Sequence, residues 1–541
     1  MIGTGTRTVR EGTFELLRER GMTTLFGNPG STELGLLRDL PPDFRYVMAL
    51  HESVAVAMAD GYAQAAGRPA FVNLHSACGV GNAMGAVVNA WHNRAPLLIT
   101  GGNQDRRHLA LEPYLFARGV ELMAPYVKHA EQPARAEDVP AALDRAWVLA
   151  QTRPYGPVFV SVPADDWDAG FLAASPAAVT REVRVAGGAD AGTVEELARR
   201  VSGGVVALVV GAGVDRDGAW TQVTELAERL GARVWAAPQA PRLGFPEDHP
   251  LYRGHLAPGY ASAAAQLDGV DVALVVGAPV FAFLPYEPSD ESLPPILHIT
   301  DDPDEAARGS SELSVIGDAR AIVDALLERL ASRPGAVAAS NDARVPAPTP
   351  PASAPISPAF LMATLAGVLP DDAVVVEESP SNRNDLRRHV WIRRPASFFA
   401  TASGGLGFAM PAAVGIKLAA PERPVICLVG DGSALFAPQA LWSAVQLGTP
   451  VTFVVVNNGR YAILESAAAF GGLEGLPSLK LPGVDLLAMA ATYGCPAARV
   501  TDPGALRDAI RSAVRGDQPM LLDVVVDPAV PPLLPAAPSV R

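Results

Sequence analysis

The chain has 541 residues, of which 49% are hydrophobic, so it is long and apolar enough for about three domains with buried cores. Its formal net charge of −14 argues against a nucleic-acid partner, because binding to a phosphate backbone requires a basic surface. The 3 cysteines are widely spaced, which argues against a disulfide framework or a zinc site. Because the sequence has no apparent secretory leader or membrane span, we expect a cytoplasmic protein without a membrane partner.

The first 185 residues alternate short apolar segments with amphipathic helical patterns. The expected strands are Thr23–Phe26, Arg45–Leu50, Ala70–His75, Leu97–Thr100 and Val158–Val162. Strands that alternate with helices predict a parallel sheet covered by helices on both faces. We therefore predict a doubly wound α/β domain over residues 1–185.

Three polar residues follow strands of this first domain: Ser31, Glu52 and His75. If the strands are parallel, all three lie at the carboxyl edge of the sheet, where open α/β sheets bind ligands. Each residue alone has an ordinary explanation. Ser31 is a possible helix cap, Glu52 a favourable charge at a helix start, and His75 a hydrogen-bonded surface residue. Their convergence at one edge makes them candidates for chemistry.

Residues 186–340 repeat the alternation and predict a central domain. Its expected strands are Val205–Val210, Val272–Val276 and Ile296–Ile299. Gly211-Ala212-Gly213 is similar to a dinucleotide-binding turn, but Arg216 replaces the third glycine of that pattern, so we expect a structural domain. A segment rich in Pro, Ala and Ser then predicts a linker over residues 341–358.

Residues 359–541 predict a third α/β domain, in which two apolar strands end in polar sequences. Val425–Val429 runs into Gly430-Asp431-Gly432-Ser433, and Val451–Val456 runs into Asn457-Asn458-Gly459. One crossover helix between parallel strands brings both ends to the same sheet edge, where Asp431 and Asn458 offer oxygen ligands suited to Mg²⁺. A GDG sequence alone is a common turn, but both strand ends together are more specific. The next helix adds free N–H groups that suit a diphosphate.

These two strand ends resemble the cofactor motif of the thiamine-diphosphate enzymes, which begins with GDG and ends with NN. The resemblance implies thiamine diphosphate and Mg²⁺ as cofactors. The implied metal ligands are Asp431, Asn458 and the backbone carbonyl of Arg460. The residues implied along the diphosphate are Gly432, Ser433, Tyr461 and Ser381, whereas Pro380 replaces a hydroxyl residue of the family.

Within this family, the chain resembles the bacterial benzoylformate decarboxylases over nearly its whole length. The segments that carry the resemblance include FGNPGSTEL, DGYAQAAGRPAFVNLHSACGVGNAMGA, GPVFVSVPADDWD, GGLGFAMPAAVGIKLAAPER and GDGSALFAPQALW. It implies three α/β domains, a cofactor bent into a V, and sites shared between the subunits of a homodimer or homotetramer. Glu52 of one subunit would then hydrogen-bond to N1′ of the pyrimidine held by the other and promote its reactive tautomer.

The resemblance also assigns the remaining site residues. Leu406 supports the bend of the cofactor, and the carbonyl of Gly404 accepts a hydrogen bond from its 4′-amino group. Ser31 and His75 contact the carboxylate and the reacting oxygen of the substrate, with His75 as a proton carrier. Asn28 and Glu33 are expected to shape the same pocket, and Asn28 is expected to lie close to the cofactor as well.

The substrate pocket departs from the family pattern. A second histidine follows the APVF segment in the benzoylformate decarboxylases, but this chain has Leu284, which cannot donate a proton. Ala400 and Ala467 stand where the family has phenylalanines, so a different or larger acyl group can fit. Ile463 and Leu464 are expected in the same pocket.

The leading hypothesis is therefore non-oxidative decarboxylation of an aromatic or branched 2-oxo acid to an aldehyde. The alternative is a carboligase or acetolactate-synthase-like transferase that forms a hydroxyketone, which the loss of the second histidine favours. A non-catalytic binding subunit is a third hypothesis, but the presence of Glu52, Asp431 and Asn458 together argues against it.

Overall fold

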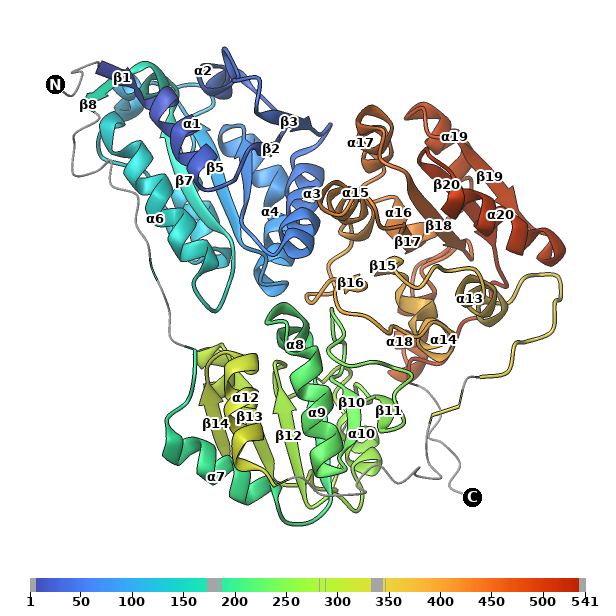
Figure 1. Ribbon diagram of the computed structural model, residues 1–541. Coiled ribbons are helices and arrows are strands. Elements are labelled where there is room, and N and C mark those ends of the chain that lie inside the picture. The colour runs from blue at the N-terminus through green and yellow to red at the C-terminus, as the bar shows by residue number, and fades with distance from the viewer. Residues whose placement is uncertain are drawn as a thin grey trace.

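The computed structural model describes residues 6–172, 183, 187–281, 283–287, 289–331, 344, 345 and 347–534. Figure 1 shows three lobes, one N-terminal, one central and one C-terminal. Each lobe is built on a six-stranded sheet of described residues, and every strand pairing within these three sheets is parallel. The predicted α/β fold with three doubly wound sheets is confirmed.

The N-terminal sheet has the strand order β3-β2-β4-β5-β7-β6. Its strands are β2 (Thr24–Gly27), β3 (Arg45–Met48), β4 (Ala70–Leu74), β5 (Leu97–Asn103), β6 (Ala130–Glu131) and β7 (Val158–Pro163). Its helices are α1 (Val9–Glu19), α2 (Leu34–Leu37), α3 (Glu52–Ala66), α4 (Ser76–His92), α5 (Gly119–Met123) and α6 (Val139–Gln151). A small antiparallel pair, β1 (Thr6–Thr8) and β8 (Gly170–Leu172), closes this domain.

The central sheet has the order β11-β10-β9-β12-β13-β14. Its strands are β9 (Val206–Val210), β10 (Arg233–Ala236), β11 (Tyr252–His255), β12 (Val272–Val276), β13 (Ile296–Thr300) and β14 (Leu313–Ile316). Its helices are α7 (Ala191–Val201), α8 (Ala212–Arg216), α9 (Trp220–Leu230), α10 (Tyr260–Gln266), α11 (Pro303–Arg308) and α12 (Ala319–Arg329). The neighbours β9 and β12 share the sequence Val-Ala-Leu-Val-Val and are buried throughout, as parallel strands covered on both faces must be.

The C-terminal sheet has the order β16-β15-β17-β18-β20-β19, which repeats the topology of the N-terminal sheet. Its strands are β15 (Val374–Glu378), β16 (Phe398–Ala400), β17 (Val425–Gly430), β18 (Val451–Asn457), β19 (Ala497–Val500) and β20 (Met520–Val525). Its helices are α13 (Pro358–Ala366), α14 (Arg383–His389), α15 (Ala409–Ala419), α16 (Asp431–Ala434), α17 (Ala440–Leu447), α18 (Ala462–Phe470), α19 (Leu486–Thr492) and α20 (Pro503–Arg515).

Helices α3 and α15 join the N-terminal and C-terminal domains, and Figure 1 shows them between the two lobes. Their backbones approach closely because glycines face the partner helix. A Cβ atom on Gly61 would lie 2.3 Å from the carbonyl oxygen of Ala412, and one on Gly415 would lie 1.9 Å from that of Met58. Only glycine therefore fits at these two points of contact.

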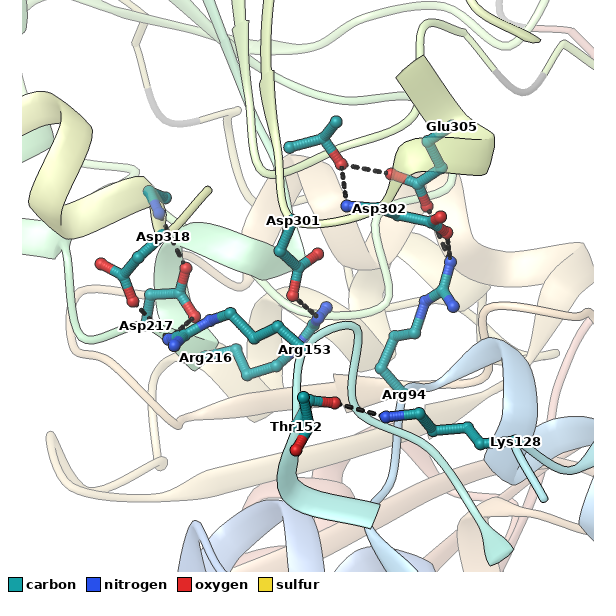
Figure 2. Close-up of polar contacts among 12 residues, drawn as sticks. Arg94, Lys128, Thr152, Arg153, Arg216, Asp217, Asp301, Asp302, Glu305 and Asp318 are labelled. Carbon is teal, nitrogen blue, oxygen red and sulfur yellow. Dashed lines mark hydrogen bonds and ion pairs between the residues drawn. The ribbon is translucent and has the colours of Figure 1, made fainter. Parts of the chain in front are cut away.

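Ion pairs join the N-terminal and central domains (Figure 2). Arg94 pairs with Asp302 and, at 3.3 Å, with Glu305. Arg153 pairs with Asp217 at 2.8 Å and with Asp318. Both arginines come from the N-terminal domain and all four acids from the central one, so these contacts fix how the two domains sit together.

The predicted strands agree with the structure to within a few residues at each end. The largest differences are at β5, which continues through Asn103, and at β3, which ends at Met48 rather than Leu50. The predicted domain boundaries at 185/186 and 340/341 fall outside the described residues and stay predictions. The linker over residues 341–358, which is described in part, also stays a prediction. Among the described helices, none combines the length and the apolar character that crossing a membrane requires.

Candidate functional site

Three neighbouring strands bring the N-terminal candidates together. Strands β3, β2 and β4 are adjacent and parallel, and Glu52, Ser31 and His75 follow them in that order. Ser31 is exposed at the start of a 3-10 turn, Ser31–Glu33. His75 ends β4 as the N-cap of α4, and Glu52 begins α3. The predicted gathering of these residues at one sheet edge is what the structure contains.

His75 is held by a buried carboxylate. Its Nδ1 lies 2.9 Å from Oε2 of Glu33, a side chain that is 1% exposed, and 3.1 Å from Oγ1 of Thr32. Thr32 Oγ1 donates to Oε1 of Glu33 at 2.5 Å. An ionised carboxylate only accepts, so the proton of the neutral imidazole lies on Nδ1 and Nε2 is left as the free edge. Burial raises the pKa of Glu33.

Two glycines make room for this pair. A Cβ atom on Gly30 would lie 2.2 Å from the imidazole ring of His75, and one on Gly102 would lie 2.1 Å from Oε1 of Glu33. Directly after His75, Ser76 has a φ of 40°, a left-handed conformation that is rare outside glycine. The sharp turn at Ser76 between β4 and α4 thus helps to aim the imidazole.

Glu52 lies in a mostly buried position, 7% exposed, beside the start of α4. Asn82 donates to its Oε2 at 3.1 Å. A Cβ atom on Gly79 would lie 3.0 Å from Oε1 of Glu52 and 3.3 Å from Cβ of His75, so this glycine separates the two candidates. Glu52 and His75 are therefore close neighbours across α4.

The C-terminal candidates gather at a second sheet edge. Strands β17 and β18 are paired up to Gly430 and Val456, so the residues that follow them lie side by side. The backbone N–H of Gly459 donates to Oδ2 of Asp431 at 2.7 Å. Oδ1 of Asn458 accepts from the N–H of Arg460 at 3.2 Å. The predicted meeting of the GDG and NN segments is thus observed.

The donor set at this edge suits a hard divalent cation that also binds phosphate. It comprises one carboxylate, one amide and one backbone carbonyl, and burial raises the pKa of the carboxyl group of Asp431. Nearby cation charge would favour its ionised form. Among the described residues, no group of three or more His, Cys, Asp or Glu side chains could hold a metal ion. Any metal here must therefore complete its coordination with the phosphates and water.

Several of the residues expected along a diphosphate lie at or beside the turn that begins α16. A Cβ atom on Gly432 would lie 2.5 Å from the ring of Tyr461, so glycine allows the two segments to approach. Ser433 is buried in the same turn. Ser381 lies half-buried in a 3-10 turn, Pro380–Asn382, that follows the neighbouring strand β15. The chemistry of these residues fits a phosphate group against backbone N–H donors.

The loop between β16 and α15 carries two further candidates, Gly404 and Leu406. Gly404 is exposed with a φ of 75°, a conformation that favours glycine. Beyond it, Glu378 accepts hydrogen bonds from the N–H groups of Gly407, Phe408 and Ala409 at 2.8, 2.8 and 2.7 Å. Burial raises the pKa of Glu378 to about 7. This anchor was not anticipated, although an acid at the end of an apolar strand could have suggested it.

The expected substrate-pocket residues are spread over all three domains. Ala400 is buried at the end of β16, whereas Leu284 in the central domain is 73% exposed. Ile463 is half-buried, and Leu464 and Ala467 are exposed on α18. Asn28 is half-buried after β2. Within the described part of one chain, no hydrogen bond or ion pair joins the Glu52–His75 edge to the Asp431–Asn458 edge.

The glycines of the central domain are explained by packing. A Cβ atom on Gly213 would lie 2.7 Å from Cα of Gly277, and one on Gly211 would lie 2.4 Å from Cβ of Ala278. Arg216 faces Asp301 at 3.6 Å (Figure 2). A cavity of about 610 Å³ borders these residues where the three domains meet.

Comparison with known proteins covers all three domains. Three family models match: the N-terminal TPP binding domain of thiamine pyrophosphate enzymes over residues 7–132, their central domain over 202–326, and their C-terminal TPP binding domain over 381–524. The benzoylformate decarboxylase of Pseudomonas aeruginosa is 41% identical over 527 residues, which cover 96% of this chain and 98% of that protein.

Two solved structures are similar over nearly the whole chain. The benzoylformate decarboxylase of Polynucleobacter necessarius superimposes with a TM-score of 0.93 at 37% identity. The thiamine diphosphate-dependent 4-hydroxybenzoylformate decarboxylase of Rhodococcus jostii RHA1 also gives a TM-score of 0.93, at 38% identity. Each match covers 97% of this chain and 100% of the other.

Proposed function

The chain belongs to the thiamine pyrophosphate enzymes, and we propose that it decarboxylates an aromatic or branched 2-oxo acid to an aldehyde. The observation that carries this proposal is that Glu52 and His75, an acid and a proton carrier, lie close together around Gly79 at one sheet edge. They do so in a chain that matches 2-oxo acid decarboxylases over nearly its whole length.

The cofactor set is thiamine diphosphate with, as we propose, Mg²⁺. Asp431, Asn458 and the carbonyl of Arg460 would hold the metal, because together they provide hard oxygen ligands at adjoining strand ends. Along the diphosphate would lie Gly432, Ser433, Tyr461 and Ser381. The carbonyl of Gly404 and the side chain of Leu406 would support the aminopyrimidine ring. When bound, thiamine diphosphate supplies the electron sink that accepts the electron pair left by departing carbon dioxide.

The side chains of the N-terminal edge then handle protons. Glu52, which is 7% exposed, would share a proton with N1′ of the pyrimidine. Ser31 would bind the substrate carboxylate, with Asn28 beside it. The bond from this carboxylate to the carbonyl carbon breaks as carbon dioxide leaves. Nε2 of His75, which carries no proton in the tautomer held by Glu33, would take up a proton from water and pass it to this carbon, which becomes the aldehyde carbon.

The shape of the pocket sets the substrate class. Ala400 and Ala467 present only methyl groups, and Leu284, Ile463 and Leu464 add an apolar surface. A bulky aromatic or branched acyl group would fill this space. Because Leu284 cannot donate a proton, product release would depend on His75 or on water.

We propose a homodimer or homotetramer with sites between subunits. Among the described residues of one chain, no hydrogen bond or ion pair joins the Glu52–His75 edge to the Asp431–Asn458 edge. In addition, α18 with the following loop exposes Leu464, Phe470, Leu473 and Leu476. Glu52 of one subunit would complete the site of the other. Analytical ultracentrifugation should therefore show no monomer at the protein concentrations used for assays.

An aldehyde assay tests the proposed activity. Purified protein with thiamine diphosphate and Mg²⁺ is incubated with benzoylformate and a panel of aromatic and branched 2-oxo acids. We expect the matching aldehyde and carbon dioxide in equal amounts from at least one acid, and none after substitution Glu52→Gln. Failure of every acid to yield aldehyde would remove the proposal.

A second candidate function is carboligation, favoured by Leu284 in place of a proton-donating histidine. Slower proton delivery leaves more time for attack on another carbonyl compound. Incubation with the best 2-oxo acid plus an acceptor aldehyde or pyruvate would then give a hydroxyketone. Substitution Leu284→His should shift the product towards free aldehyde; an unchanged product ratio would argue against this candidate.

A further inference from the structure

Two asparagines of the N-terminal domain hold the loop that carries Gly404 and Leu406. Asn93, the residue that ends α4, accepts the N–H of Ala402 through its Oδ1 at 2.9 Å. One helical turn earlier, Asn89 accepts from Oγ1 of Thr401 at 3.2 Å and from the hydroxyl of Ser403, and its Nδ2 donates to the carbonyl of Gly405 at 3.3 Å. The end of α4 therefore binds loop 401–405 at several successive residues.

Asn93 is itself fixed by a buried acid, Asp60. Nδ2 of Asn93 donates to Oδ2 of Asp60 at 2.8 Å, and Nε2 of Gln64 donates to Oδ1 of the same carboxylate at 2.7 Å. The exposed fractions are 0% for Asp60, 3% for Asn89 and 5% for Asn93. Because Oδ2 of Asp60 accepts from Nδ2 of Asn93, the amide oxygen of Asn93 is turned towards Ala402.

The far end of the loop has its own anchor. Glu378 binds the N–H groups of residues 407–409, so the chain is clamped on both sides of Leu406. Between the clamps, Gly404 is exposed with a left-handed backbone. A loop held this way keeps its shape before any ligand arrives, which lowers the entropic cost of binding.

Burying a carboxylate costs stability even where a nearby charge, here that of Arg242, partly offsets the cost, and burial raises the pKa of Asp60 to about 7. An apolar side chain at position 60 would pack between the helices without this cost. The arrangement is therefore better explained by the orientation that it imposes on Asn93 than by its contribution to packing.

We propose that Asp60, Asn89 and Asn93 are positioning residues for thiamine diphosphate, which preset loop 401–405 so that Gly404 and Leu406 meet the aminopyrimidine ring. The inference rests on the proposed function, because it takes Gly404 and Leu406 as cofactor contacts. The residues act in the same chain as the loop, from the domain that also carries Glu52.

The test compares three substitutions in the full chain. Asn93→Leu removes the amide but keeps the size, Asn89→Asp is isosteric but loses the donor to Gly405, and Asp60→Asn can still accept from Asn93. Ser443→Ala is the control, because it removes a buried hydroxyl from α17, outside loop 401–405. Calorimetry with thiamine diphosphate and Mg²⁺ measures affinity, and hydrogen exchange of the apoprotein measures the protection of single amides.

We expect Asn93→Leu and Asn89→Asp to weaken cofactor binding about tenfold, the effect of losing one or two hydrogen bonds. In the apoprotein, Asn93→Leu should expose the amide of Ala402 to exchange while the amides held by Glu378 stay protected. Asp60→Asn should retain most of the affinity, and Ser443→Ala all of it. A global loss of stability would instead raise exchange at both ends of the loop.

The outcomes separate the two proposals. If the unsubstituted protein fails to bind thiamine diphosphate and Mg²⁺, the assigned cofactor site is wrong and this inference falls with it. If the unsubstituted protein binds but Asn93→Leu and Asn89→Asp bind equally well, only the positioning role is wrong. Should Asn93→Leu fail to fold, the isosteric Asn89→Asp decides alone.

Discussion

Glu33 is the residue on which the behaviour of His75 depends. Both of its carboxylate oxygens already accept hydrogen bonds, from Thr32 on one side and from Gly30 and His75 on the other. A neutral amide cannot satisfy all of these donors, because one of its two atoms is itself a donor. The tautomer and the direction of the imidazole thus follow from the charge on one buried side chain.

Substitution Glu33→Gln should lower kcat by about ten- to a hundredfold, the usual range for a misaligned acid–base group. Cofactor affinity should change little, because in the proposed site Glu33 contacts His75 and not the cofactor. Steady-state kinetics and calorimetry on the same preparation measure both. Thr32→Val is the milder comparison, since it leaves the carboxylate–imidazole bond in place; equal losses of kcat and cofactor affinity in Glu33→Gln would contradict this role.

Asp60 should make stability depend on pH. Its folded pKa of about 7 lies above the ordinary value of 3.8, so its contribution is fully present below pH 3.8 and is lost as the pH rises through 7. Asp60→Asn removes this titration. The apoprotein carrying Asp60→Asn should therefore gain stability relative to the unsubstituted protein as the pH rises from 5 to 8. Urea unfolding at the two pH values measures the difference, and a difference independent of pH would contradict the prediction.

At the scale of elements, the contact between α3 and α15 is the tightest constraint. The backbone carbonyl of Met58 lies where a Cβ atom of residue 415 would be, and backbone atoms cannot rotate away as a side chain can. The two helices come from domains that are far apart in the sequence, so this close approach fixes the distance between two sheet edges.

Gly415→Ala should destabilise the protein by about 3 kcal/mol or more, as overpacking against backbone does. Gly85→Ala on α4 is the matched control, because its Cβ would meet nothing within 4 Å. That control should change stability by less than about 1 kcal/mol. Denaturant unfolding of both variants is the measurement, and similar midpoints would show that the helices can separate.

The strands were predictable from the sequence because each one is determined by a local pattern of residues. Strands such as β9 and β12 are continuous apolar runs between turns, and the meeting of Asp431 with the segment after β18 followed from parallel topology alone. The hydrogen bonds that hold loop 401–405 and residues 407–409 were not predictable. Asn89 and Gly405 lie in different domains, and no pattern along the chain links an amide to a loop more than 300 residues away.

The partnership of Glu33 and His75 was only partly foreseen. The resemblance placed both in one pocket, but their bond depends on Gly30 and Gly102, whose missing side chains leave the space. A glycine in a sequence does not say which neighbour needs the room. The roles of the individual site residues stay predictions that the substitutions above test.

At the scale of the whole molecule, ion pairs decide how the central domain is held. Arg94 is 15% exposed and faces two acids, Asp302 and Glu305, so its removal would leave two carboxylates close together and mostly buried (Figure 2). Such an imbalance costs more than the loss of an exposed pair.

Arg94→Gln should lower stability by about 3 kcal/mol, and the central domain should unfold in a separate transition. Arg18→Gln is the control, since Arg18 also forms an ion pair, with Asp43, but both side chains are nearly half exposed. It should cost less than about 1 kcal/mol. Scanning calorimetry of the apoprotein distinguishes one transition from two, and a single unshifted transition for Arg94→Gln would contradict the role of this clamp.

Helix α3 has a consequence for a symmetric assembly. In the proposed assembly its first residue, Glu52, would serve the cofactor of a neighbouring subunit, whereas Asp60, about two turns further along, would act through Asn93 on the loop at the cofactor of its own subunit. A helix is stiff over so short a span, so a shift at one end is felt at the other. One helix would then connect two catalytic centres, and cofactor binding in one centre would change the geometry of the other.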